Sequence, residues 1–174
     1  TMQEYLSEAV VLDAVPNGDL DLRVHLFTKK FGKLTAKVKS ARKITSKLAG
    51  HLQPGNVIQV RLVEKNGLQA VDALKNRRLE TDLNNLRWLN RMLAEFQPDL
   101  ELWEVVLGGP DATVGAGWDW RRVLGILGWD PREAECHICR KPPAYFRVGD
   151  QHFFCEACAL KTSPDELIYL GNRS

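Results

Sequence analysis

The 174-residue sequence lacks the segments that mark membrane and secreted proteins. It has no run of about eighteen apolar residues, which a membrane-spanning helix requires. It also lacks an N-terminal basic segment followed by an apolar one, the pattern of a secretory signal. From these absences we expect a cytoplasmic protein without a membrane partner.

The sequence also lacks the common catalytic motifs. There is no G-x-x-x-x-G-K-[ST] phosphate loop, no G-x-S-x-G nucleophile turn and no H-E-x-x-H zinc helix. The carboxylates are scattered and form no cluster typical of a metal-dependent nuclease. We therefore expect no enzyme, with metal-dependent hydrolysis as a distant alternative.

Charge, tryptophan and cysteine are unevenly distributed along the chain. Residues 1–78 hold 14 basic and 7 acidic side chains, whereas residues 79–174 hold 10 basic and 15 acidic ones. All five Trp and all four Cys lie in the second part. Such asymmetry suggests that only one part meets a polyanion, and it predicts two domains, 1–78 and 79–174.

The first 78 residues have the pattern of β-strands. In residues 33–39, apolar Leu34, Ala36 and Val38 alternate with polar residues, which is typical of a half-buried strand. Turn signals at 16–19 (PNGD) and 65–67 (KNG) separate further strands, expected near 5–15, 20–27, 56–63 and 68–74. Residues 40–52 break the pattern as a loop or short helix. Five strands with one irregular insertion predict an OB-type barrel.

The second part is predicted to be mainly helical. One helix face is formed by residues spaced three or four apart: Leu79, Leu83, Leu86, Leu89, Leu93 and Phe96. Shorter helices are expected through 103–107, ended by Gly108, and over 119–128, stopped by Gly128 and Pro131. The predicted fold class is thus α+β, an N-terminal five-stranded OB-type barrel followed by a small helical domain with a zinc finger at 136–158.

The zinc finger is predicted from the four cysteines. Cys136, Cys139, Cys155 and Cys158 have the spacing C-x2-C-x15-C-x2-C, which indicates one zinc ion. Four thiolates complete a tetrahedron and leave no position for water, so the site would be structural. Two disulfides or a redox pair are weaker alternatives for a cytoplasmic chain, and His137 or His152 could replace a thiolate.

The segment 23–47 is the most basic part of the chain and contains no Asp or Glu. We call it the basic segment. Its nine cationic residues are Arg23, Lys29, Lys30, Lys33, Lys37, Lys39, Arg42, Lys43 and Lys47. Alternation places Lys33, Lys37 and Lys39 on one wet strand face, and neighbouring Ser and Thr can donate to phosphate oxygens. The basic segment therefore predicts nucleic-acid binding. A merely solvated face is the alternative, and Phe31 is interpreted as a core cap more readily than as a base-stacking residue.

At this point the chain resembles a known family, the bacterial DNA repair and recombination mediator RecO. The resemblance covers nearly the whole chain. It rests on the order and spacing of residues 18–21 (GDLD), 26–28 (LFT), 31–34 (FGKL), 40–43 (SARK), 46–48 (SKL), 52–54 (LQP) and 127–129 (LGW), with Pro131 just before the cysteines.

The resemblance implies an N-terminal OB domain and a helical domain with a zinc finger. It also implies a non-enzymatic protein that binds single- and double-stranded DNA, anneals complementary strands and works with RecR to load RecA, hence a nucleoid-associated location. Binding to the single-stranded-DNA-binding protein is less expected, because the helical region is short, as in a compact or truncated member.

A different class of function remains as an alternative. A zinc-ribbon module that binds protein rather than DNA would use the Trp-rich segment 118–129 as its working surface. Core packing is the more ordinary role for those Trp residues.

Overall fold

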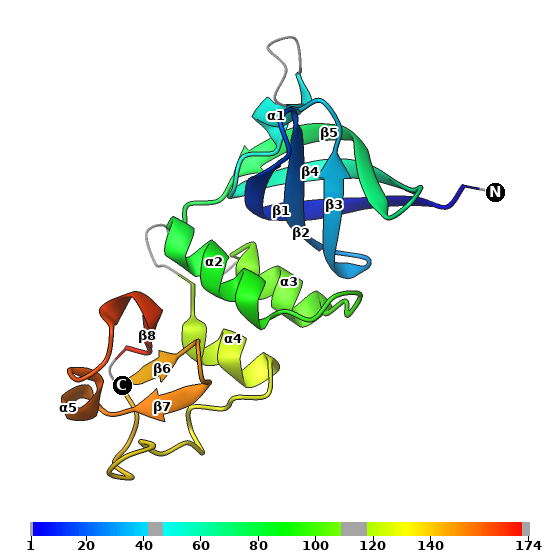
Figure 1. Cartoon of the computed structure of the whole chain (residues 1–174). Helices are drawn as coiled ribbons and strands as arrows, with labels where there is room; N and C mark the ends of the chain where they lie inside the picture. The colour runs from blue at the N-terminus through cyan, green and yellow to red at the C-terminus, as the bar shows by residue number, and fades with distance from the viewer. Residues whose placement is uncertain (1, 42–46, 109–117, 172–174) are drawn as a thin grey trace. The chain divides into compact units, whose positions relative to one another are not determined.

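Figure 1 shows the protein as a computed structural model, which describes residues 2–41, 47–108 and 118–171. The chain forms two compact units, Thr1–Leu100 and Glu101–Ser174. The predicted division after residue 78 coincides with the end of the last barrel strand, whereas the first compact unit continues to Leu100.

The first unit contains the predicted five-stranded barrel. Its strands are β1 (Glu4–Asn17), β2 (Asp21–Thr28), β3 (Gly32–Val38), β4 (Asn56–Glu64) and β5 (Leu68–Arg78). They close in the order β1-β2-β3-β5-β4. All pairs are antiparallel except β3 with β5, which meet in parallel at Lys37 and Gln69. The predicted α+β fold with an OB-like barrel is confirmed.

Side-chain alternation explains why these residues form a barrel. In β3 the residues Leu34, Ala36 and Val38 are buried, while the intervening polar residues are only half-buried. The two predicted turns are also present. Asn66 and Gly67 both have positive φ, 52° and 94°, as a two-residue hairpin turn between β4 and β5 requires.

A short helix, α1 (Leu48–His51), lies in the irregular insertion between β3 and β4. The second helix, α2 (Leu83–Met92), is shorter than the predicted apolar face of residues 79–96. Asp82 caps its N-terminus by accepting from the Asn85 N–H, and Leu93 already has an extended backbone. Leu83, Leu86 and Leu89 lie in α2 as predicted, whereas Leu79, Leu93 and Phe96 lie outside it. The prediction of a helical position was wrong for these last three residues.

The second unit combines helices with a small sheet. Its helices are α3 (Leu100–Val106), which begins one residue before the unit, α4 (Trp120–Ile126), α5 (Glu156–Ala159) and the 3-10 turn η1 (Pro164–Glu166). The sheet has the order β7-β6-β8, with β6 (Tyr145–Arg147), β7 (His152–Phe154) and β8 (Leu167–Tyr169). β6 pairs antiparallel with both β7 and β8.

The tryptophans of the second unit serve mainly in packing. Trp103 and Trp120 are buried, and the Trp129 ring lies 5.7 Å from the ring of Phe146. This agrees with the core-packing interpretation of the Trp-rich segment. Over the ranges that the structure describes, none of the helices has the length and apolar character needed to cross a membrane.

Candidate metal centre and nucleic-acid interface

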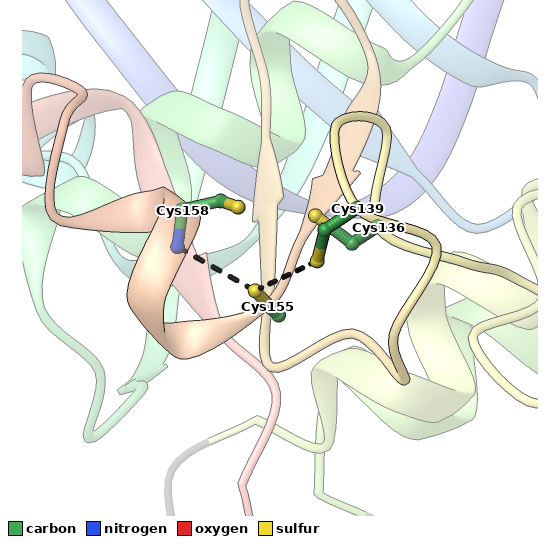
Figure 2. Close-up of side chains that lie close together, drawn as sticks. All are labelled: Cys136, Cys139, Cys155 and Cys158. Carbon is green, nitrogen blue, oxygen red and sulfur yellow. Dashed lines mark hydrogen bonds between the residues drawn. The ribbon is translucent and has the colours of Figure 1, made fainter.

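The four cysteine sulfurs converge on one point of the second unit, as Figure 2 shows. All four Sγ atoms lie within 4.8 Å of one another, and those of Cys139 and Cys155 are 3.5 Å apart. The four thiols form no disulfide. Neither His137 nor His152 belongs to this ligand group; instead their rings stack on each other at 3.8 Å.

Local backbone hydrogen bonds bring the two Cys pairs together. The first pair lies on a turn closed by the Arg140 N–H donating to the Cys136 carbonyl, with Arg140 at φ 63°. The second pair lies at α5, where Cys155 is the N-cap residue and Cys158 is in the first turn. The His137 N–H donates to the Phe153 carbonyl and so ties the first turn to β7, directly before the second pair.

The geometry and charge of the cluster fit a tetrahedral cation. Zinc–sulfur bonds of about 2.3 Å place thiolate sulfurs about 3.8 Å apart, close to the observed spacing. Although burial opposes it, hydrogen bonds from backbone N–H groups lower the pKa of Cys136 to about 6. The hydrogen bond with Cys155 and burial raise the pKa of Cys158 to about 12. One thiol thus keeps its proton beside a thiolate, and a dication would remove that conflict.

The structure places the described part of the basic segment on β2, β3 and their flanking turns. Arg23, Lys29, Lys30, Lys39 and Lys47 are exposed. Arg23 on β2 is the direct cross-strand partner of Lys37 on β3, so strand pairing brings these two cations together. Arg42 and Lys43 lie outside the described residues.

Two lysines of the predicted wet face make specific contacts within the barrel unit. Lys33 Nζ donates to the main-chain carbonyl oxygen of Asn90 at 2.7 Å. Partial burial lowers the pKa of the Lys33 ammonium group. Lys37 Nζ lies 3.2 Å from an Asp21 carboxylate oxygen. Both residues are half-buried rather than fully wet. Lys39 is the exposed member of the three.

A second group of cations was not predicted. Lys75, Arg77 and Arg78 are exposed at the end of β5, and the Lys75 N–H donates to His51 Nδ1 at 3.0 Å. This bond ties β5 to α1, which Lys47 directly precedes. The fold thereby brings a basic end of β5 beside the end of the basic segment. The sequence signal is the run 75–78 (KNRR), which stands at the predicted domain boundary.

Phe31 has the structural role that was favoured for it. Its ring packs edge-on against Tyr5 with centroids 5.0 Å apart, and both residues pack on the barrel core.

Comparisons with known proteins place this chain in a family. Residues 2–78 match the family model described as "Recombination protein O N terminal". The chain is 31% identical to a "DNA repair protein RecO" of Thermodesulfovibrio yellowstonii, over 89% of this chain and 70% of that protein. The chain belongs to the RecO family.

Two other RecO relatives agree with this assignment. The "DNA repair protein RecO" of Acidithiobacillus ferrooxidans is 30% identical over 86% of this chain and 64% of its own length. The "DNA repair protein RecO" of Shouchella clausii is 28% identical over 88% of this chain and 68% of its own length. The chain thus spans about two thirds of the length of these RecO proteins.

Proposed function

We propose that this RecO-family chain acts in DNA repair and recombination by binding DNA through its barrel. The observation that carries the proposal is that a chain related to proteins named for DNA repair has the described part of its basic segment on the outer face of an OB-like barrel. Proposed contacts are the nine cations from Arg23 to Lys47, and Lys75, Arg77 and Arg78 extend them beside α1.

The chemistry of these residues suits a phosphate backbone rather than base edges. Alternate residues of a strand are about 6–7 Å apart, a spacing comparable to that of successive phosphates along a DNA strand. Lysine is a flexible point charge and is poorly suited to fixed bidentate base recognition. We infer sequence-tolerant binding of single and double strands, which a protein that anneals any complementary pair would need.

We further propose that the four cysteines hold one structural zinc ion. The support is the four converging sulfurs and the raised pKa of Cys158, which a dication would relieve. With four protein ligands the ion would have no open position for a substrate, so its contribution would be to the folding of the second unit. This accords with a mediator that is not an enzyme.

The family resemblance is the basis for the proposed partners. We propose RecR as a protein partner, with which the chain would load RecA onto DNA. Binding to the single-stranded-DNA-binding protein is proposed to be weaker or absent. A pull-down with purified RecR and with that protein tests both; failure with RecR, where a longer relative binds, would contradict the family role.

A charge-reversal experiment tests DNA binding. The variant Arg23→Glu/Lys39→Glu/Lys47→Glu changes three exposed cations of the basic segment and leaves the contacts of Lys33 and Lys37 intact. Affinity for single- and double-stranded DNA is measured by fluorescence anisotropy across a salt series. Contacts with about four to six phosphates give a log–log salt slope of roughly −3 to −5 for wild type.

We expect the triple variant to bind DNA of every sequence at least tenfold more weakly than wild type, with a flatter salt dependence. The matched control is Lys65→Glu/Lys141→Glu/Lys161→Glu, which makes the same change in net charge at exposed lysines elsewhere. Equal weakening by both variants would show only a general charge effect. Unchanged binding by the first variant would favour the alternative, a zinc-containing module that binds protein.

A further inference from the structure

Phe96 combines two properties that are rarely found together. Its side chain is 54% exposed, and its backbone has φ 56°, in the left-handed region. A bulky residue in this region is strained, and such strain persists only where surrounding contacts impose it. Among the described non-glycine residues with positive φ, Phe96 is the one aromatic.

Contacts with β3 impose this conformation. The Phe96 N–H donates to the Lys33 carbonyl at 3.0 Å, and Glu95 forms a parallel β-bridge with Lys33. The Glu95 carboxylate accepts a hydrogen bond from Thr35 Oγ1 at 2.7 Å. Residues 95–97, which we call the Phe96 segment, are thus attached along the strand that carries part of the basic segment.

The Phe96 segment also touches the turn that holds two exposed lysines. A Cβ atom on Gly32 would lie 2.4 Å from the Gln97 carbonyl carbon, so the two backbones are in direct contact. Lys29 and Lys30 lie in the β2–β3 turn that Gly32, the first residue of β3, follows, and both are exposed. In Figure 1 the α2–α3 loop passes beside this turn.

Exposed cations lie on the elements that hold the Phe96 segment. Lys29 and Lys30 are exposed in the turn that Gly32 follows, and Arg91 is exposed in the last turn of α2. The adjacent acid in the chain, Glu95, has its carboxylate hydrogen-bonded to Thr35. Tyr5 and Phe31 are occupied in core packing, and among the described residues of this unit Phe96 is the aromatic with a largely exposed side chain.

We propose that Phe96 is a stacking platform for an unpaired base of single-stranded DNA whose phosphates are held by Lys29 and Lys30. An aromatic face beside cations is the recurring arrangement for sequence-tolerant single-strand binding, because every base has a π face. Bases inside a duplex are already stacked, so Phe96 adds affinity for single strands only. The inference rests on the proposed DNA binding and specifies how the barrel distinguishes strand forms.

Two DNA probes and four variants of the full chain test the inference. The probes are a mixed-sequence single strand containing one 2-aminopurine and a blunt hairpin duplex of equal phosphate number. The variants are Phe96→Ala, Phe96→Tyr and Phe96→Gly, with Leu74→Ala as the control, since Leu74 is an exposed apolar residue on β5 of the same unit.

We expect Phe96→Ala to weaken single-strand binding roughly tenfold and to leave duplex binding within about twofold. The salt slope stays unchanged, because no charge is removed. The 2-aminopurine emission change on binding is lost in Phe96→Ala and kept in Phe96→Tyr. Phe96→Gly raises the midpoint of thermal unfolding, because glycine tolerates φ 56°, yet weakens single-strand binding.

The outcomes separate this inference from the proposed function. If the wild type binds both probes and Phe96→Ala binds the single strand as tightly, the stacking role is overturned while DNA binding stands. Equal loss on both probes, or equal loss in Leu74→Ala, also overturns it. If the wild type binds neither probe, the proposed function fails and the inference fails with it.

Discussion

The ammonium group of Lys33 donates a hydrogen bond to the main-chain carbonyl oxygen of Asn90, 2.7 Å away. Lys33 lies on β3 and Asn90 in α2, so the bond ties the helix to the barrel. Together with the Phe96 N–H bond to the Lys33 carbonyl, it joins residues beyond 78 to the barrel within the first compact unit. A lysine whose spacing predicted a DNA contact is thus engaged in tertiary structure.

Replacing this lysine is expected to destabilise the protein. Lys33→Met keeps the aliphatic stem but removes the donor to Asn90, so the free energy of unfolding in urea should fall by about 1 kcal/mol. Lys39→Met, at an exposed position, should change it by less than about 0.5 kcal/mol. Equal effects of the two substitutions would show that the Asn90 contact contributes nothing measurable.

Gly32 is expected to be intolerant of any side chain. Gly32→Ala should destabilise the protein by more than about 2 kcal/mol, because the new Cβ meets the Gln97 backbone and φ is 73°. Gly18→Ala is the control, since Gly18 has a similar φ of 76° with open space around it. The difference between their urea midpoints isolates the contact with the Phe96 segment. A similar loss of stability in Gly32→Ala and Gly18→Ala would mean that the contact between Gly32 and Gln97 is loose.

Asp21 should make barrel stability depend on pH. The backbone N–H of Ser40 and then the Lys37 ammonium lower the pKa of the Asp21 carboxyl below its ordinary value. A carboxyl with a lowered folded-state pKa contributes stability above its unfolded pKa of about 3.9, and that contribution is lost as pH falls through the folded value.

The variant Asp21→Asn tests this dependence. It should be less stable than wild type at pH 6, and the two proteins should converge in urea midpoint as the pH falls toward about 3. Asp19→Asn, in the preceding turn, is the control and should follow the wild-type curve. A constant gap between wild type and Asp21→Asn at all pH values would contradict a role for the ionised carboxylate.

Zinc removal should unfold the cysteine region and leave the barrel intact. We expect one zinc per chain by elemental analysis and its loss in Cys136→Ser, with faster amide exchange in β6 and β7 but not in β1 to β5. Because the pKa of Cys158 is about 12, zinc must displace its proton. Affinity should therefore fall as pH is lowered, by about tenfold per pH unit for each proton released. Absence of zinc, or disulfides in its place, would refute the site.

Local patterns were sufficient to predict the barrel and the cysteine cluster. The alternation around Leu34, Ala36 and Val38 specifies which face of β3 is buried, since successive strand residues point to opposite faces. The C-x2-C pairs need only a tight turn each and the β6–β7 hairpin between them. These features depend on neighbours within a few residues, so they are legible in sequence.

The roles of individual surface residues depended on contacts distant in the chain. The periodicity of residues 79–96 suggested one long helix, yet the Asp82 cap and the extended backbone of Leu93 shorten it. The residues that follow are then free to pair with β3, which leaves Phe96 exposed. β8 was missed because it joins β6 from further along the chain, whereas β6 and β7 are linked by a short turn.

By itself, the sequence determined the buried face of β3, the hairpin turn at Asn66 and Gly67 and the pairing of the cysteines into one cluster. Only the tertiary structure decided that Lys33 binds Asn90, that Lys75 lies against His51 and that Phe96 points into solvent beside the β2–β3 turn. The physical reason is the separation along the chain of the residues that interact. Alternation and turn chemistry act between near neighbours, whereas these contacts join residues far apart in the chain, which meet only once the barrel has closed.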